Sequence, residues 1–186
     1  MTKSEFEKLL RLAGGIARDR DFFLIGSQAL RGVCPSIPRD FPQTLEADLY
    51  PRHHPQAWTL LRSQLGRSSK FFRHHGYYLD CTDPGLATLP EGWMDRLVPY
   101  RTAHTGGITA WCLEPHNLFV SKLVAGREKD RVFLRAMLRH KLARAALTSR
   151  RIEHLPVSTD EKQDMIKASK RLVAESRATR NALKVK

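Results

Sequence analysis

The spacing of apolar residues divides the start of the chain into a helix, a strand and a turn. Between Ser4 and Arg18 apolar residues recur every three or four positions behind a Ser4-x-x-Glu7 pattern, which predicts a capped amphipathic helix. The apolar run from Asp21 to Ile25 predicts a short buried strand. Gly26-Ser27 follows at once, and the next residues can begin a second helix.

The middle of the chain is also predicted to contain both strands and a helix. After a proline-rich loop, Thr44 to Tyr50 predicts a strand closed by Pro51, and Pro55 to Leu65 predicts a helix. Two further strands are expected at Lys70–Arg73 and Tyr77–Cys81, joined at His74-His75-Gly76.

The last third is predicted to be mainly helical. One more strand opens at Gly106-Gly107 and ends at Cys112, and three helices are then expected. The first begins at Glu114, the second spans Glu128–Ala146, and the third begins at a Ser158-x-x-Glu161 capping box.

The elements together indicate an α/β (α+β) fold, in which a small mixed sheet is flanked by helices and followed by a helical, basic C-terminal part. We expect a core domain at residues 1–113 and a helical basic region at residues 114–186 that packs on the core.

Composition adds a partner class. The hydrophobic content of 41% is that of a folded protein, but the formal net charge of +13 is high and favours a polyanion such as nucleic acid. A basic helix face that merely aids solubility is the alternative. The excess is concentrated toward the C-terminus, at Arg139, Lys141, Arg144, Arg150, Arg151, Lys167, Lys170, Arg171, Arg177, Arg180, Lys184 and Lys186.

Other features point to a cytoplasmic protein without a zinc site. No apolar run approaches the roughly 20 residues of a membrane helix, and the N-terminus lacks the order of a signal peptide. The three cysteines are widely spaced, and the pairs His53-His54 and His74-His75 fit no zinc spacing. The residues Trp58, Trp93 and Trp111 are interpreted as packing residues.

Two short motifs carry candidate chemistry. Gly26-Ser27 lies between a strand and a helix, where backbone amides and the Ser27 hydroxyl can bind phosphate. Glu46 and Asp48 project from one face of a strand, and Asp80 on a later strand can complete a set of carboxylates for one or two magnesium ions. Asp83 is the rival third ligand, although a Thr-Asp-Pro sequence is typical of a turn.

The order of these motifs resembles the signature of the nucleotidyltransferase superfamily: Gly-Ser comes first, then Glu-x-Asp, then an aspartate on a strand. Glu46 occupies the position where an aspartate is usual. Residues 118–130 resemble the Lys-Leu-x-Ala-x-Arg-x-Lys-Asp helix of its abortive-infection toxin branch. Gly26–Ala29, Glu46–Pro51 and Leu89–Trp93 through Leu97 are similar to a little-characterised bacterial family within the superfamily. The resemblance spans about Phe22 to Leu138.

The resemblance implies roles for individual residues. Ser27 would contact nucleotide phosphates, Glu46 and Asp48 would hold magnesium, and Lys122 and Arg127 would face the triphosphate. Asp130 would either accept the proton of the attacking hydroxyl or orient Arg127. Ordinary charge pairs on an exposed helix face are the alternative for this last group.

The expected function is magnesium-dependent transfer of a nucleoside monophosphate from a nucleoside triphosphate to an acceptor hydroxyl. RNA, of which tRNA is one candidate, is the expected acceptor. The toxin resemblance adds a role in a toxin–antitoxin or phage-defence system with an antitoxin protein as partner. The alternative is a catalytically inactive module of the same fold that binds nucleic acid or protein.

Overall fold

The computed structural model describes residues 1–184, with the side chains of residue 177 and residues 179–184 excepted. The predicted basic side chains of Arg177, Arg180, Lys184 and Lys186 therefore lie outside the described part. The chain forms two compact units that alternate along the sequence. The first unit contains Met1–Pro38, Gln43–Leu86 and Arg96–Glu114, and the second contains Arg39–Pro42, Ala87–Asp95 and Pro115–Lys186.

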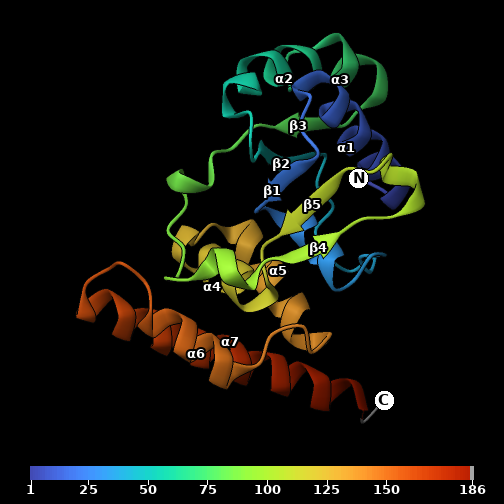
Figure 1. The fold of residues 1–186 in the computed structure, drawn as a ribbon. Coiled ribbons are helices and arrows are strands. Elements are labelled where there is room, and N and C mark those ends of the chain that lie inside the picture. The colour runs from blue at the N-terminus through green and yellow to red at the C-terminus, as the bar shows by residue number, and fades with distance from the viewer. Residues whose placement is uncertain (185–186) are drawn as a thin grey trace. The chain divides into compact units, whose positions relative to one another are not determined.

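A five-stranded mixed sheet forms the centre of the first unit (Figure 1). Its strands are β1 (Asp21–Leu24), β2 (Glu46–Pro51), β3 (Tyr78–Asp80), β4 (Val98–Tyr100) and β5 (Thr109–Cys112), in the order β3-β2-β1-β5-β4. β1 pairs antiparallel with β2 and parallel with β5, whereas β2 and β3 are parallel. The mixed sheet that the sequence predicts is confirmed, but β4 was not predicted.

The two faces of the sheet differ in burial. Along β2 the residues alternate between partly exposed and buried, so that Ala47, Leu49 and Pro51 turn to the covered face. Phe22 and Leu24 of β1 and Leu79 of β3 are buried on the same face by register. The carboxylates of β2 therefore lie on the opposite face of the sheet.

Helix α1 (Lys3–Ala17) packs against the covered face through Phe6, whose ring meets that of Tyr100 edge-on with centroids 5.5 Å apart. The predicted capping box was wrong, because the box is formed by Thr2 and Glu5. Glu7, predicted to be part of the box, is instead buried and accepts hydrogen bonds from Tyr100 Oη at 2.7 Å and Thr102 Oγ1 at 2.9 Å.

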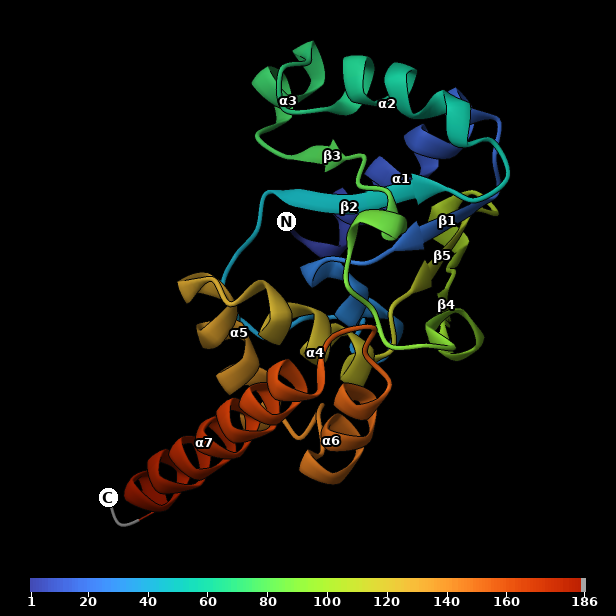
Figure 2. The same cartoon turned by 90° about the vertical axis from the view of Figure 1, so that its left-hand side faces the viewer.

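Two short helices lie alongside the edge strand β3 (Figure 2). The 3-10 helix η2 (Pro55–Ala57) leads into α2 (Trp58–Leu65), and α3 (Lys70–His75) follows. The predicted strand at Lys70–Arg73 was therefore wrong. The Ser69 side chain caps the helix by accepting from Phe72 N at 3.1 Å, and Gly76 ends it in the left-handed conformation, φ 74°.

Short 3-10 helices form most of the remaining connections. They are η1 (Ser27–Gly32), η3 (Pro84–Leu86), η4 (Trp93–Arg96) and η5 (Ala103–Thr105). The helix expected after Gly26-Ser27 is thus a 3-10 helix of six residues.

The second unit is helical, with α4 (Pro115–Ala125), α5 (Glu128–Arg139), α6 (Ala145–Glu153) and α7 (Thr159–Lys184). The single helix predicted at Glu128–Ala146 is wrong, because the chain leaves the helix at His140 and Lys141 adopts a positive φ of 58°. Val120, Ile152 and Leu155 form a buried apolar cluster. None of the described helices combines the length and the apolar character that crossing a membrane requires.

Removing the Tyr100 hydroxyl should destabilise the first unit. Tyr100→Phe leaves the buried Glu7 carboxylate without its closer donor, so we expect the free energy of unfolding to fall by about 1–3 kcal/mol in urea titrations at neutral pH. Tyr77→Phe is the control, since within the described part of the chain the Tyr77 hydroxyl forms no hydrogen bond. Equal unfolding midpoints for the two variants would contradict this role of Glu7.

Candidate functional site

Gly26 and Asp48 approach each other closely where β1 ends. Ile25 N donates to Asp48 O at 3.3 Å, and a Cβ built on Gly26 would lie 1.6 Å from Oδ2 of Asp48. The φ of Gly26 is −85°, so any residue could adopt this backbone conformation. Glycine is therefore required for space, because a side chain would displace the Asp48 carboxylate.

Asp48 and Asp80 are direct partners across the β2–β3 pair. The parallel register aligns Glu46 with Tyr78, Ala47 with Leu79, and Asp48 with Asp80. Because residues aligned in this way project from the same face, the two aspartates share a face with Glu46. Asp80 is exposed, while Glu46 and Asp48 are partly exposed. The structure thus brings together the predicted carboxylates of two neighbouring strands.

Tyr78 holds the carboxylate of Glu46. Its hydroxyl donates to Oε2 of Glu46 at 2.8 Å. Burial, followed by this hydrogen bond and the charge of Glu46, raises the pKa of Tyr78 to about 12. The hydroxyl therefore stays protonated and remains a donor at neutral pH, which fixes the direction of the longer glutamate side chain. The sequence did not predict this contact.

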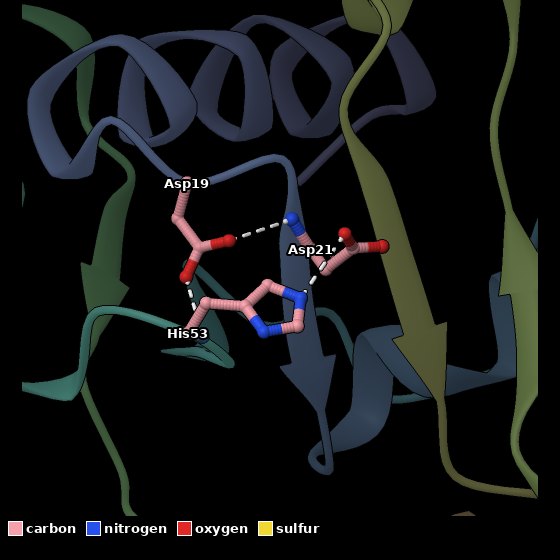
Figure 3. A group of neighbouring side chains, drawn as sticks. All are labelled: Asp19, Asp21 and His53. Atoms are coloured by element: carbon pink, nitrogen blue, oxygen red, sulfur yellow. Dashed lines mark hydrogen bonds and ion pairs between the residues drawn. The ribbon is translucent and has the colours of Figure 1, made fainter.

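A different set of potential metal ligands lies at the opposite end of β1 (Figure 3). Among the described residues, Asp19, Asp21 and His53 form the one group of three such side chains whose ligand atoms all lie within 4.8 Å of one another. Glu46, Asp48 and Asp80 are not gathered this tightly. His53 is exposed and places Nε2 3.4 Å from Oδ2 of Asp21.

The oxygens of this cluster are already used within the fold. Asp19 accepts from the backbone N of Asp21 at 3.0 Å, of His53 at 2.7 Å and of His54 at 3.0 Å. Asp21 Oδ1 accepts from Nε1 of Trp111 at 2.7 Å. The cluster joins the start of β1 to the segment after β2, which is a structural role.

In the second unit, Lys122, Arg127 and Asp130 form a compact ion-pair group. Asp130, 1% exposed, accepts from Lys122 Nζ at 3.1 Å and from Arg127 Nε at 2.6 Å. Lys122 is also buried, with Nζ 4.5 Å from the centroid of the Phe133 ring. Burial alone would raise the pKa of Asp130, but the hydrogen bond from Arg127 and the charge of Lys122 lower it.

This geometry separates the predicted roles of the three residues. The two carboxylate oxygens of Asp130 accept from Lys122 and Arg127, which favours orientation of the arginine over proton acceptance. The Arg127 side chain is 57% exposed, whereas that of Lys122 is 8% exposed. Arg127 is therefore the more accessible cation for a phosphate.

The rival ligand Asp83 forms a turn. Its Oδ1 accepts from Gly85 N at 2.8 Å, the local hydrogen bond expected of an aspartate that precedes proline. Asp83 is exposed and immediately precedes η3, which begins at Pro84. This contact accounts for Asp83 without a metal ion.

A mixed sheet that sets a Gly-Ser turn against carboxylates on two neighbouring strands is the arrangement expected of a nucleotidyltransferase. A family model described as a nucleotidyltransferase of unknown function (DUF6036) matches residues 5–170. The chain belongs to this nucleotidyltransferase family. The match extends beyond both ends of the motif region, Phe22 to Leu138. No curated protein and no solved structure matches the chain.

Sequence reasoning missed a basic segment in the first unit. From Arg52 to Leu79 the chain contains five Arg or Lys residues and no Asp or Glu. This run of basic residues without acidic ones can be read from the sequence, but the C-terminal region contains more basic residues and was therefore chosen as the basic part of the protein.

Asp19 should make the fold sensitive to acid. Burial would raise its pKa, but the three backbone N–H donors lower it below the ordinary value for aspartate. Because the folded-state pKa is depressed, the stabilisation is present above the unfolded pKa, about 3.9, and is lost as the pH falls through the folded pKa. Asp19→Ala should therefore lower the free energy of unfolding by about 2–4 kcal/mol at pH 7.

Urea titrations between neutral and acid pH would measure this effect. The difference between wild type and Asp19→Ala should shrink as the solution is acidified, whereas the exposed Asp95→Ala variant should differ little from wild type throughout. A difference that does not depend on pH would argue against the ionised carboxylate as its source.

Asp130→Asn should destabilise the second unit. The substitution leaves the buried ammonium of Lys122 without its charged partner, a change that typically costs about 3–5 kcal/mol. Glu128→Gln on the same helix is the matched control, because Glu128 pairs with Arg131 at 3.8 Å on the surface and should contribute less than about 1 kcal/mol. Thermal unfolding followed by circular dichroism measures both, and similar melting temperatures would rule out the structural role.

Proposed function

We propose that this protein transfers a nucleoside monophosphate from a nucleoside triphosphate to an acceptor hydroxyl. The observation that carries the proposal is the register of β2 and β3, which aligns Asp48 with Asp80 beside Gly26. Membership of a nucleotidyltransferase family supports the same chemistry.

The donor set fits magnesium. Carboxylate oxygens are the ligands that this ion prefers, and like charges on one sheet face repel unless a cation lies between them. Asp48 and Asp80 would hold the ion, and Glu46 would join them by turning from Tyr78. Bound magnesium, as one or two ions, supplies a Lewis acid that offsets negative charge on the phosphates.

The protein's own residues have two tasks in this reaction. Ser27 and the backbone at the start of η1 bind phosphate oxygens. The acceptor oxygen attacks the α-phosphorus, the bond to the oxygen that bridges to the β-phosphate breaks, and pyrophosphate leaves with the bonding electrons. Asp80 would hold the ion through one carboxylate oxygen and accept the acceptor proton on the other, because within the described part of the chain its exposed carboxylate has no hydrogen bond or ion pair.

The resemblance to abortive-infection toxins extends the proposal to the biological setting. RNA, of which tRNA is one candidate, is the proposed acceptor, and an antitoxin protein is the proposed partner. The net charge of +13 supports nucleic acid over a small neutral acceptor.

A binding module that has lost turnover is the second candidate. The observation that favours it is the Tyr78–Glu46 hydrogen bond, which occupies one carboxylate oxygen of the set. Such a module would bind nucleic acid in a salt-dependent manner and would transfer no nucleotide.

Asp48→Asn and Asp80→Asn should each lower nucleotide transfer by at least about 100-fold, because several kcal/mol of charge stabilisation depend on the carboxylates. Transfer of label from each of the four α-labelled triphosphates to total RNA, with magnesium, is the measurement. Asp83→Asn is the control and should retain activity, since an asparagine oxygen preserves the turn. Absence of transfer by the wild type, or equal transfer by Asp48→Asn, would overturn the proposal in favour of the binding module.

A further inference from the structure

A cleft of about 590 Å³ opens between α2 and the edge strand β3. Its lining includes Trp58, Arg62, Ser63, Arg67 and Ser68 on the helical side and Asp80 on the strand. The volume lies within the ~300–1,000 Å³ that ligand sites span. All of its lining residues lie within Gln43–Leu86, so the cleft belongs entirely to the first unit. The helix α2 lies beside β3, which is at the edge of the sheet (Figure 2).

Two arginines give the cleft a positive wall. Arg62 and Arg67 are both exposed, and among the side chains that the structure describes neither guanidinium has an ion-pair or hydrogen-bond partner. Their charges reach the strand, since Arg67 opposes the rise in the pKa of Tyr78 and Arg62 opposes that of Cys81. The arginines therefore act along β3 on both sides of Leu79.

On the helical side of the cleft, every charged lining residue is basic. No Asp or Glu occurs between Arg52 and Leu79, so Asp80 is the first acidic residue after the helical segment. Lys70 and Arg73 are further exposed cations on α3. Two arginines on the helical side and one carboxylate on the strand side favour an elongated anion whose end lies at Asp80.

Trp58 adds an aromatic surface to the cleft. Trp58, interpreted from the sequence as a core or turn packing residue, is not a core residue, because 41% of its surface is exposed at the first turn of α2. A positively charged groove with an accessible aromatic ring is the combination that binds single-stranded nucleic acid, since bases stack on the ring while cations follow the phosphates. Hydroxyls of Ser63 and Ser68 add hydrogen-bonding groups to the lining.

We propose that the α2–β3 cleft binds the acceptor, and that the acceptor is the end of a single-stranded polynucleotide. Phosphates lie against Arg62 and Arg67, a base stacks on Trp58, and the terminal hydroxyl lies at Asp80. This assignment rests on the proposed function for its chemistry, because the hydroxyl proton passes to Asp80 as the oxygen bonds to the α-phosphorus and pyrophosphate leaves. The binding site itself does not depend on turnover.

Binding of a short fluorescein-labelled strand to the full chain tests the site. Arg62→Gln/Arg67→Gln should weaken binding, and the slope of log affinity against log salt should fall in magnitude by roughly 1.4 for two lost phosphate contacts. Trp58→Ala should weaken binding roughly tenfold through loss of stacking. The strand is tested both as RNA and as DNA, and a preference between them identifies the sugar that the cleft accepts.

The matched control removes the same charge elsewhere in the first unit. Arg20 and Arg101 are exposed and do not line the cleft, so Arg20→Gln/Arg101→Gln should leave affinity and salt slope close to those of the wild type. Circular dichroism melts establish that all variants are folded. Equal affinities and slopes for the two double variants would overturn the proposal.

Photo-crosslinking locates the end of the strand directly. A photoreactive nucleotide at the 3′ terminus should label a peptide within residues 58–80, and labelling confined to residues 139–186 would overturn the assignment. Crosslinking to the cleft without any nucleotide transfer would reject the proposed function and retain the site. Transfer to a small-molecule hydroxyl without crosslinking to the cleft would retain the function and reject the site.

Discussion

The close approach of Gly26 to Asp48 is the constraint on which the candidate site depends. The chain turns away from β2 after β1 at Gly26, where a methyl group added to the glycine would occupy the position of the aspartate oxygen. Asp48 in turn is fixed against Asp80 by the parallel register of β2 and β3. The turn, the carboxylates and the edge of the sheet are therefore positioned by one run of backbone pairing, and a shift of one residue in β2 would send its carboxylates to the covered face.

The sequence predicted the fold class and the residues that meet in the first unit. Alternation along residues 46–51 was sufficient to place Glu46 and Asp48 together, and the register that adds Asp80 required the parallel pairing of β2 with β3, which alternation does not specify. From the sequence, glycine at position 26 was expected to allow close approach of a phosphate. In the structure, glycine is needed there because a side chain would collide with the Asp48 carboxylate. Tyr78 was not predicted because its hydrogen bond to Glu46 spans 32 residues.

The errors arose where capping chemistry outweighs the apolar pattern. Phe71 and Phe72 favour a strand by composition, but Ser69 and Gly76 supply both ends of a helix at residues 70–75. In the predicted helix at 128–146 the apolar spacing continues past residue 139, although the helix ends at His140 and Lys141 adopts a positive φ. The buried state of Lys122 depends on Asp130 and Phe133, which a list of charged residues cannot reveal.

The two units are interleaved along the chain. Three segments of the first alternate with three of the second, so the backbone passes between them five times. The short segment Arg39–Pro42 illustrates the result, because Phe41 meets the ring of Phe133 with centroids 5.1 Å apart and Asp40 pairs with Arg139 at 3.0 Å, almost a hundred residues later. No single cut can separate the units without leaving part of one attached to the other. During synthesis on the ribosome, Asp40 and Phe41 emerge long before α5, so these residues of the helical unit cannot make their contacts until α5 has been synthesised.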